Sequence, residues 1–538
     1  MKTMASKLSI ALALWACAAV APARAQEPKA GEYYTDSTDL GFKIRVPAKW
    51  DPIPPSPDDG NLIIKYDPKT NKEVQIGKGE TMDLHVWLLK FDRRKAPAAA
   101  AQPAGQRKFV AQDKNLPEWL KAHGLTGFKP GTPKDLEINK VAASECVYLN
   151  TTLSNAKEEV RLYAMTYKLT PDVDVVFAGW GPGDPKRWSK FEGAFKEMAR
   201  SLKMVDVASG KPDLAADASL RDKKRAELVD RLTRTPGWKL YESPNYFFVS
   251  DNDDKAFLDE LMGRLEAIHA VYEQDYPAAK AKEIREAAAL AKTGAVEKPK
   301  KEDGSDDDEP KDKPKTGVAE RIVTDNSEQA KCSVVRVCKN ADEYHSYGGP
   351  PQAAGHWDSN AQELVIYDDR ANGGKGDTWI TLNHEAFHQY IYYFYGNIAP
   401  HSWYNEGTGD FYSGYVYKNA RFTLEKNPWR KETIKQAIQQ EEFVPLAELM
   451  RWDQKQYYGQ NKLGTTGYVT YAEGWSLIYF LRTGKKNKAK GWDARWDTIL
   501  EDYLRVLAAT GKPEQAIEQC LTGVDIDALQ AAWLEYTK

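Results

Sequence analysis

Thr378–Tyr395 reads TWITLNHEAFHQYIYYFY and has the periodicity of a single α-helix. Its apolar side chains recur at intervals of three and four residues, so they form one face that the helix can bury. They are Trp379, Leu382, Ala386, Phe387, Tyr390, Ile391 and Phe394. Asp377 or Thr378 can cap the start of the helix, and Gly396 can end it. We therefore expect a helix that packs against a hydrophobic core.

The same helix carries an HExxH motif, HEAFH, at residues 384–388. At about 3.6 residues per turn, His384 and His388 stand one turn apart with both imidazoles on one side. They can therefore hold one metal ion between them. Glu385 lies about 100° round the helix from His384, near enough to accept a proton from water activated by the metal. Core hydrogen bonding is the alternative interpretation of these polar residues.

A third ligand comes from the segment WYNEGTGD at residues 403–410, which reads as a second helix. Zinc sites in hydrolases commonly take three protein ligands and keep one position open for water. Glu406 offers the carboxylate for such a site. Asp410 lies four residues on, on the same face, and can accept the outer ring N–H of one ligand histidine, while Asn405 can do so for the other. These residues predict one zinc ion per chain.

An HExxH helix followed by a glutamate in an Asn-Glu-Gly context resembles the gluzincins, which include the thermolysin-like proteases and the zinc aminopeptidases. The resemblance covers roughly residues 239–538 and implies a mainly helical catalytic domain with a small mixed sheet. It implies that the two histidines and Glu406 bind zinc, and that Glu385 is the general base and later the proton donor. Asn405 and Asp410 match the Asn-Glu-x3-Asp pattern of the thermolysin-like members. The Gly-x-Met-x-Asn signature of the aminopeptidases is absent from the sequence.

A later helical pattern extends the resemblance. Residues 467–481 read GYVTYAEGWSLIYFL, and Tyr471-Ala-Glu-Gly474 is similar to the Tyr-Glu-x-Gly pattern of zinc aminopeptidases. In those enzymes the tyrosine hydroxyl stabilises the oxyanion, so the similarity implies this role for Tyr471. Tyr468 is the competing candidate, because it lies three residues earlier on nearly the same face. Core packing of both tyrosines is the third interpretation.

Residues 363–368, ELVIYD, read as a strand just before the motif helix. Gluzincins bind extended substrate by adding it to an edge strand beside that helix. The resemblance therefore implies that Leu364, Val365 and Ile366 bind substrate. An ordinary strand in the core of a sheet is the alternative.

The N-terminal part of the chain has a different pattern. Residues 26–206 contain several strand-like segments with period two, and they end in an amphipathic helix from about Lys186 to Met204. This arrangement predicts an α/β sandwich, so the fold class of the whole chain is α+β. The opening Tyr-Thr-Asp-x5-Phe-Lys-Ile-x2-Pro-x2-Trp resembles PsbP-like domains, over about a third of the chain.

Residues 207–238 are charged and read as a helical linker to the catalytic domain at 239–538. Within that domain, residues 298–315 read KPKKEDGSDDDEPKDKPK and cannot bury enough surface to order themselves. We expect a disordered charged insertion at about residues 283–330. It interrupts one domain, because residues 245–250 and 332–338 look like strands of one sheet.

Residues 1–25 have the features of a secretory signal peptide. Lys2 and Lys7 precede an apolar run at residues 8–20, and Ala23-Arg24-Ala25 matches a signal-peptidase site. The run of 13 residues is short of the roughly 20 that a spanning helix needs, so we expect no stable membrane insertion. A lipoprotein site at Cys17 is a weaker alternative. The sequence predicts a secreted or periplasmic protein.

Composition limits the class of partner. Lys and Arg together number 75 and Asp and Glu 78, and this near balance argues against nucleic acid, because phosphate binding depends on a basic surface. The four cysteines outside the signal form no CxxC pair, and the sequence leaves their pairing open. We expect a zinc metallopeptidase that acts on a peptide or protein. A zinc hydrolase of another bond and a cell-envelope binding protein with a vestigial metal fold are the alternatives, but the intact Glu385 counts against the second.

Overall fold

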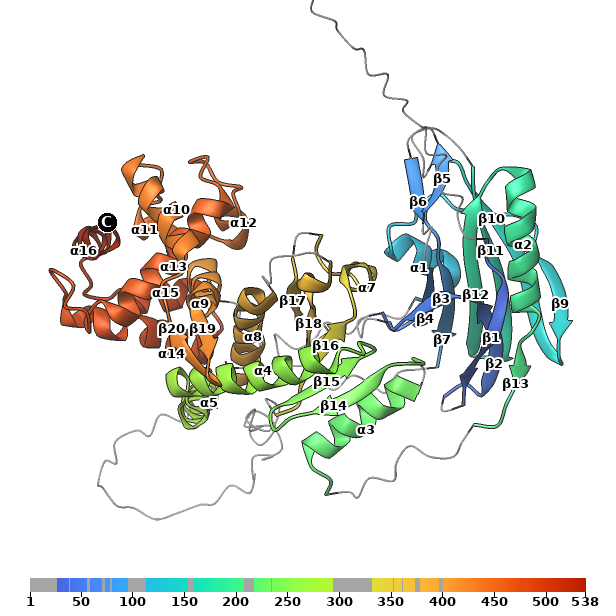
Figure 1. Ribbon diagram of the computed structural model, residues 1–538, viewed down its shortest axis with the longest axis horizontal. Helices are drawn as coiled ribbons and strands as arrows, with labels where there is room; N and C mark the ends of the chain where they lie inside the picture. The colour runs from blue at the N-terminus through green and yellow to red at the C-terminus, as the bar shows by residue number, and fades with distance from the viewer. Residues whose placement is uncertain are drawn as a thin grey trace, which may run out of the picture. The chain divides into compact units, whose positions relative to one another are not determined.

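The computed structural model describes residues 27–37, 39–55, 59–69, 73–77, 80–94, 113–152, 159–207, 217–233, 235–293, 331–351, 353–359, 361–372, 378–395 and 400–538. These residues form two compact units, one ending at Val207 and the other containing the described residues from 217 on. Strands dominate the first unit and helices the second (Figure 1). The predicted α+β class is therefore confirmed. The predicted signal peptide lies outside the described residues.

A large sheet forms the core of the first unit, in the strand order β3-β4-β7-β12-β11-β10-β8, and β9 also pairs with β10. Its central strands run antiparallel. The strands are β3 (Trp50–Ile53), β4 (Leu62–Pro68), β7 (Val86–Asp92), β8 (Lys129–Pro130), β9 (Lys134–Ile138), β10 (Val141–Asn150), β11 (Val160–Thr170) and β12 (Val173–Pro182). Two smaller sheets contain β1 (Ala30–Asp36), β2 (Phe42–Pro47) and β13 (Lys203–Met204), and β5 (Glu73–Gly77) with β6 (Glu80–Asp83).

Helices cover both faces of the large sheet. Alternate residues of β12 point to opposite faces, so the helices contact different side chains of this strand. Helix α2 (Pro185–Ala199) packs Phe195 against Phe177, and a Cβ on Gly179 would lie 2.8 Å from that Phe195 ring. Trp180 faces the other side, where Trp87 lies between it and Trp119 of α1 (Leu116–Ala122). The predicted sandwich is thus a sheet between helices.

The helix predicted for residues 186–204 is shorter in the structure. Helix α2 ends at Ala199, and Lys203 and Met204 pair with Lys43 and Phe42 of β2. The predicted helix was too long because Leu202, which lies past the helix end and just before β13, is also buried and continues the apolar periodicity.

The second unit contains a five-stranded mixed sheet in the order β14-β15-β16-β18-β17. The strands are β14 (Lys239–Glu242), β15 (Tyr246–Ser250), β16 (Ser333–Cys338), β17 (Gly355–Asp358) and β18 (Glu363–Tyr367). The central pairs β15–β16 and β16–β18 are parallel, and both outer pairs are antiparallel. Segments 245–250 and 332–338 are therefore neighbours in one sheet, as the sequence predicted. The cysteines Cys146, Cys332, Cys338 and Cys520 are all free.

Helices α4 (Lys255–Asp275) and α8 (Thr378–Tyr395) pack on one face of this sheet, and α3 (Leu220–Thr233) and α7 (Ala341–Ser346) on the other. Val335 and Val337 of β16 face the first pair. Val334 faces the second, in a separate small core that includes Leu228 of α3. Figure 1 shows the sheet between these helices.

Two predicted boundaries in this unit differ from the structure. The helix in the expected linker at 207–238 is α3, and it is not a free linker because its Leu228 is fully buried against Trp238 and Phe247. Residues 283–293, expected to be part of the insertion, belong to helix α5, which covers Ala278–Thr293. A charged helix surface and a charged loop look alike in composition. Residues 294–330, with the Lys298–Lys315 run, lie outside the described residues.

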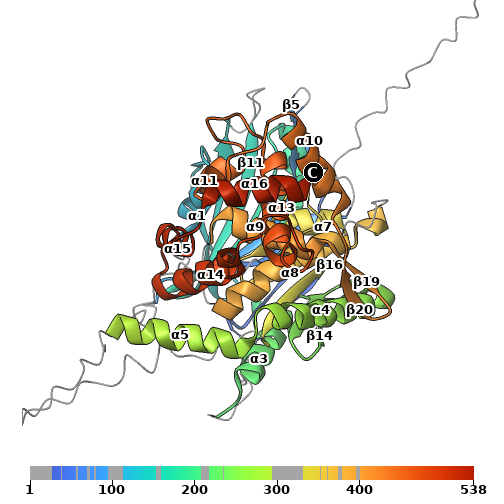
Figure 2. The same ribbon diagram turned by 90° about the vertical axis from the view of Figure 1, so that its left-hand side faces the viewer.

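The rest of the second unit is a group of helices around α9 (Ser402–Ser413), which contacts both α8 and α13 (Gly467–Thr483). The other elements are η1 (Asp369–Asn372), β19 (Tyr415–Lys418), β20 (Arg421–Leu424), α10 (Pro428–Gln439), α11 (Leu446–Leu449), α12 (Gln454–Tyr457), η2 (Ala494–Thr498), α14 (Ile499–Thr510), α15 (Pro513–Cys520) and α16 (Ile526–Thr537). Figures 1 and 2 show α14, α15 and α16 on the outside of this group.

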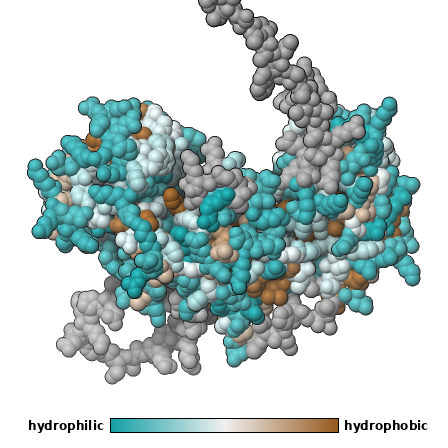
Figure 3. Space-filling view, in the orientation of Figure 1, coloured by the Kyte–Doolittle hydropathy of each residue, from teal (hydrophilic) through white to brown (hydrophobic). Residues whose placement is uncertain are grey.

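The described surface is mainly polar. In the view of Figure 3, hydrophilic side chains predominate on both units and hydrophobic ones form only small patches. Among the described helices, none combines the length and apolar character that crossing a membrane requires.

Helices α9 and α13 cross closely and bury a carboxyl group. A Cβ on Gly407 of α9 would lie 2.6 Å from the carbonyl oxygen of Gly474 of α13, so the glycines permit this approach. Glu473, next to Gly474, is fully buried, and its Oε2 accepts the backbone N–H of Val444 at 3.0 Å. Burial raises the pKa of Glu473 well above its usual range, and the Val444 N–H offsets this only in part.

We expect the Glu473→Gln variant to gain stability relative to the wild type as the pH rises. Folded Glu473 keeps a proton that the unfolded chain loses above about pH 4.5, so the free energy of unfolding of the wild type falls with pH. Glutamine has no such dependence. The difference between the two proteins should grow by up to about 1.4 kcal/mol per pH unit above pH 4.5. Urea unfolding at several pH values measures it, with exposed Glu448→Gln as the control. A difference independent of pH would mean that Glu473 is ionised when folded.

Candidate metal centre

Helix α8 has the predicted bounds, and five residues of the predicted face are buried: Leu382, Ala386, Phe387, Tyr390 and Ile391. Leu382, Ala386 and Phe387 are at most 1% exposed and belong to the main core of the second unit. The core fixes the rotation of the helix, so its other side presents His384 and His388 to α9. Their ring centroids are 4.7 Å apart, as expected for residues one turn apart.

Three atoms that could bind a metal ion converge between α8 and α9. His384 Nε2 lies 3.2 Å from Glu406 Oε2, and His388 Nε2 lies 3.7 Å from the same oxygen. All three atoms lie within 4.8 Å of one another, and each side chain is close to 90% buried. Among the described residues, this is the one group of three or more His, Cys, Asp or Glu side chains with such spacing.

Two residues of α9 hold His384 in place. Its Nδ1 lies 3.2 Å from Asp410 Oδ1, on the side of the ring away from Glu406. A Cβ on Gly409 would lie 2.8 Å from the ring, so the imidazole can lie against α9 only because residue 409 is glycine. The predicted partnership of Asp410 with His384 is present in the geometry.

Asp410 is held in turn by Arg430 of α10. Arg430 Nε lies 2.7 Å from Asp410 Oδ2, and Nη2 donates to Oδ1 at 3.3 Å. Both side chains are largely buried, and the guanidinium also lies over the ring of Tyr471, 5.0 Å from its centroid. Arg430 and His384 therefore both hold the Asp410 side chain in position.

Asn405 does not have the predicted contact with the second histidine. Its Nδ2 lies 3.5 Å from Glu406 Oε1, and His388 Nδ1 is buried with no hydrogen-bond partner among the described residues. The partner predicted for Asn405 was therefore wrong. Asn405 is adjacent to Glu406 on α9, so its amide contacts that carboxylate and not a histidine of α8.

The charged groups of the site shift the pKa values of His384 and Glu406 in opposite directions. Burial lowers the pKa of His384, but its contacts with Asp410 and Glu406 outweigh burial and raise the pKa well above the usual range. Burial raises the pKa of Glu406, but His388 and His384 lower it well below the usual range. Both shifts favour a positive charge beside the carboxylate. A metal ion held by these residues would supply that positive charge.

The residues fit a zinc ion by donor chemistry and spacing. Two imidazole nitrogens and one carboxylate oxygen are the donors of a common catalytic zinc site. Donors at zinc distances in a tetrahedron are roughly 3.4 Å apart, close to the 3.2 and 3.7 Å between the histidines and Glu406. Asp410 behind His384 completes the carboxylate–histidine arrangement that orients a metal ligand.

Glu385 lies beside the ligands and contacts the sheet. Its Oε2 accepts the backbone N–H of Trp357 of β17 at 2.8 Å. Strand β17 is the edge of the sheet next to α8, whereas β18 lies between β16 and β17. Glu385 is thus held at the edge strand.

The predicted substrate strand is wrong in position. Leu364, Val365 and Ile366 are fully buried in β18, whose two neighbours use its hydrogen-bonding groups. No substrate can be added beside it. The segment 355–358 folds back antiparallel and covers β18, so the edge strand is β17. Alternation of side chains indicates a strand but does not determine its order in the sheet.

Tyr471 lies at the site and Tyr468 does not. Tyr471 lines the same pocket as Glu406, and its pKa is raised by burial and then by the Glu406 carboxylate. Tyr468 is 50% exposed and packs edge-on against Trp429, outside the pocket. Another tyrosine, Tyr458, donates its hydroxyl to Glu406 Oε1 at 3.2 Å, and burial and Glu406 raise its pKa to about 12.

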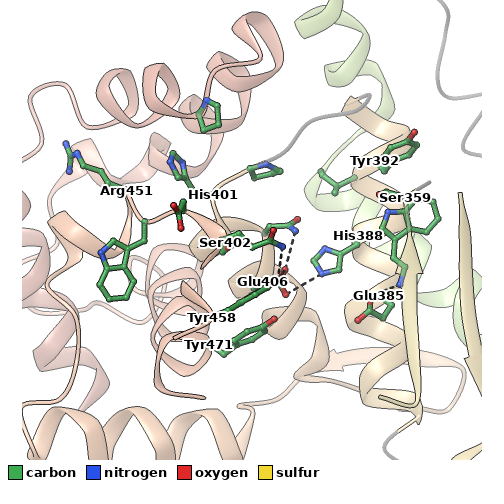
Figure 4. Close-up of a pocket in the computed structure, with 18 of the residues that line it drawn as sticks. Ser359, Glu385, His388, Tyr392, His401, Ser402, Glu406, Arg451, Tyr458 and Tyr471 are labelled. Carbon is green, nitrogen blue, oxygen red and sulfur yellow. Dashed lines mark hydrogen bonds and ion pairs between the residues drawn. The ribbon is translucent and has the colours of Figure 1, made fainter. Parts of the chain in front are cut away.

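A pocket of about 660 Å³ opens beside the ligands. Figure 4 shows Glu385 and His388 on one side, Tyr458 and Tyr471 on the other, and Glu406 between them. The far end is lined by charged, polar and ring side chains, which include His401, Ser402, Arg451, Trp452 and Glu514. The volume lies in the range of pockets that bind small organic molecules, or a few residues of a peptide.

Three contributors were not predicted from the sequence: Gly409, Arg430 and Tyr458. Gly407 and Gly409 could have been noticed in the sequence. Each glycine lowers the stability of a helix by about 1 kcal/mol, so two in one short helix indicate that another element packs closely against it. Arg430 and Tyr458 lie on other elements and reach the site only through packing, so their spacing along the chain carries no signal.

We expect Asp410→Asn to weaken zinc binding by about 10–100-fold, because the loss of the carboxylate loosens His384 and lowers its basicity as a ligand. Competition with a chromogenic chelator measures the zinc Kd. Exposed Asp527→Asn on α16 is the matched control and should bind zinc as the wild type does. An unchanged Kd for Asp410→Asn would remove Asp410 from the metal centre.

Comparison with known proteins gives only weak similarities. No protein-family model matches the chain, and no curated protein matches it. The solution structure of PsbP from the cyanobacterium Synechocystis sp. is 10% identical and covers 32% of this chain and 91% of its own, with a TM-score of 0.22. A crystal structure of a Pseudomonas aeruginosa protein of unknown function is 13% identical and covers 32% and 96%, with a TM-score of 0.16. The similarity to PsbP is thus weak and extends over about a third of this chain.

Proposed function

We propose that this chain is an exported zinc-dependent hydrolase, and specifically a metallopeptidase. The observation that supports it most is the convergence of His384, His388 and Glu406 beside Glu385. Glu385, His388 and Glu406 also line an open pocket. The resemblance of the HExxH and Asn-Glu-Gly segments to the gluzincins supports the choice of a peptide substrate. The basic, apolar and small-residue segments within residues 1–25 support export to the periplasm or the medium.

Each residue has a defined task in this proposal. His384, His388 and Glu406 hold the ion, which supplies a Lewis acid that polarises a carbonyl group and lowers the pKa of water. Glu385 accepts a proton from water and passes it to the leaving amine. Its contact with the Trp357 N–H keeps its carboxylate at the pocket wall.

The residues that line the pocket indicate how a substrate would be contacted. Tyr471 can donate its hydroxyl to the oxyanion that develops at the scissile carbonyl, and burial keeps that hydroxyl protonated at neutral pH. Trp357 and Ser359 line the pocket from β17 and the turn after it. An extended peptide would therefore run along β17, and not along the covered strand β18.

The rival function is a binding protein of the cell envelope with a vestigial metal site. Such a protein has no need of a base, yet Glu385 is in place beside the ligands and faces the pocket (Figure 4). A zinc hydrolase of another bond keeps the same residues in the same tasks. The identity of the scissile bond is therefore the property to measure.

The test combines metal analysis with a peptide library. Purified full-length protein, as isolated and after zinc supplementation, should contain about one zinc per chain. Incubation with the library, followed by mass spectrometry, should give cleaved peptides that disappear after chelation and return when zinc is added. Zinc binding without any cleavage would favour the binding protein, and absence of zinc would end the proposal.

A further inference from the structure

Tyr458 places a second phenol at the metal centre. It follows α12 directly, lines the pocket, and is 43% exposed. Its hydroxyl lies 3.2 Å from Glu406 Oε1. A carboxylate can only accept hydrogen bonds, so the phenol is the donor. This contact crosses from the α12 turn to α9, and no sequence motif indicates it.

The two oxygens of Glu406 have different partners. Oε2 faces the imidazoles of His384 and His388 at 3.2 and 3.7 Å. Oε1 faces the other way, toward Tyr458 and, at 3.5 Å, Asn405 Nδ2. One oxygen is thus directed to the ligand cluster and the other to hydrogen-bond donors.

Tyr458 is itself oriented by neighbours. Gln454 Nε2 donates to its hydroxyl at 3.3 Å. Its ring stacks on that of Tyr471, with centroids 5.9 Å apart and an interplanar angle of 17°. Because the Tyr458 oxygen accepts from Gln454, its one proton remains for Glu406.

We propose that Tyr458 is a positioning residue of the metal centre, which holds Oε1 of Glu406 so that the carboxylate offers only Oε2 to the ion. The inference rests on the proposed zinc site. Carboxylates bind metals through one oxygen or two, and a hydrogen bond to one oxygen favours single-oxygen binding. Glu406 held in this way would leave the pocket side of a bound ion free for substrate, and the stacked Tyr458 ring supports Tyr471 beside it.

The test compares Tyr458→Phe with Tyr468→Phe. Both variants remove one hydroxyl from a half-exposed tyrosine, but Tyr468 lies outside the pocket. The ring of residue 458 remains stacked on Tyr471, so the fold is kept, and circular dichroism checks it. Zinc affinity is measured by chelator competition. The visible absorption of the Co²⁺-loaded protein reports coordination number, a property that a merely structural role would not change.

Tyr458→Phe should weaken zinc binding by about tenfold and lower the Co²⁺ absorption intensity, as Glu406 turns to bind with both oxygens. Tyr468→Phe should match the wild type in both measurements. If zinc affinity and Co²⁺ spectrum are unchanged in Tyr458→Phe, the inference fails while the proposed function stands. If the wild-type chain binds neither ion, both fail together.

Discussion

Glu385→Gln is expected to keep about one zinc per chain and to lower peptide turnover by about 10²-fold or more. Glutamine has the shape of glutamate but cannot accept a proton from water. It can still accept the N–H of Trp357, which donates to Glu385 at 2.8 Å, so the local fold should persist. Metal analysis and the turnover of a cleaved peptide measure the two quantities.

The control for Glu385→Gln is Glu432→Gln, an exposed residue of α10. It makes the same chemical change without reaching the pocket, and turnover should remain at the wild-type value. Loss of zinc from Glu385→Gln would make Glu385 a ligand or a structural residue. Unchanged turnover would remove it from the mechanism.

His388→Ala is expected to lower zinc affinity by more than the roughly 100-fold that a supporting residue contributes, because it removes one of three ligands. The reason is visible in the spacing, since His388 Nε2 lies 3.7 Å from Glu406 Oε2 and, among the described histidines, only His384 and His388 belong to the group. Zinc binding also stabilises the folded state, by about 4 kcal/mol when zinc is present at a thousand times Kd. Added zinc should therefore raise the melting temperature of the wild type much more than that of the variant.

The control for His388→Ala is His123→Ala, an exposed histidine of the first unit. This variant should bind zinc and respond to it as the wild type does. An equal zinc-induced rise in melting temperature for His388→Ala and wild type would contradict the ligand assignment.

Much of the candidate site was predictable because its spacing is local. A helix brings residues four apart to one side whatever surrounds it, so the pair His384 and His388 follows from sequence alone. The same rule places Asp410 one turn from Glu406, and the structure has it 3.2 Å from His384. The bounds of α8 also agree with the prediction, because a long apolar face marks a helix clearly.

Strand order and contacts between distant elements were decided only by tertiary structure. The 363–367 segment has the composition of a strand in either position, and it is buried because residues 355–358 pair outside it. Tyr458 and Arg430 reach Glu406 and Asp410 from separate elements through packing.

The physical reason lies in the range of the interactions. Periodicity in a helix or strand reports which face of that element is buried, and this information is contained within one or two turns. The choice among Tyr458, Tyr468 and Tyr471 depends on how α12 and α13 pack against α9, which involves residues far apart in the chain. The sequence therefore determined the helix of His384 and His388 and its neighbour in outline, while packing of the whole second unit decided which strand is the edge and which phenols face the candidate ligands.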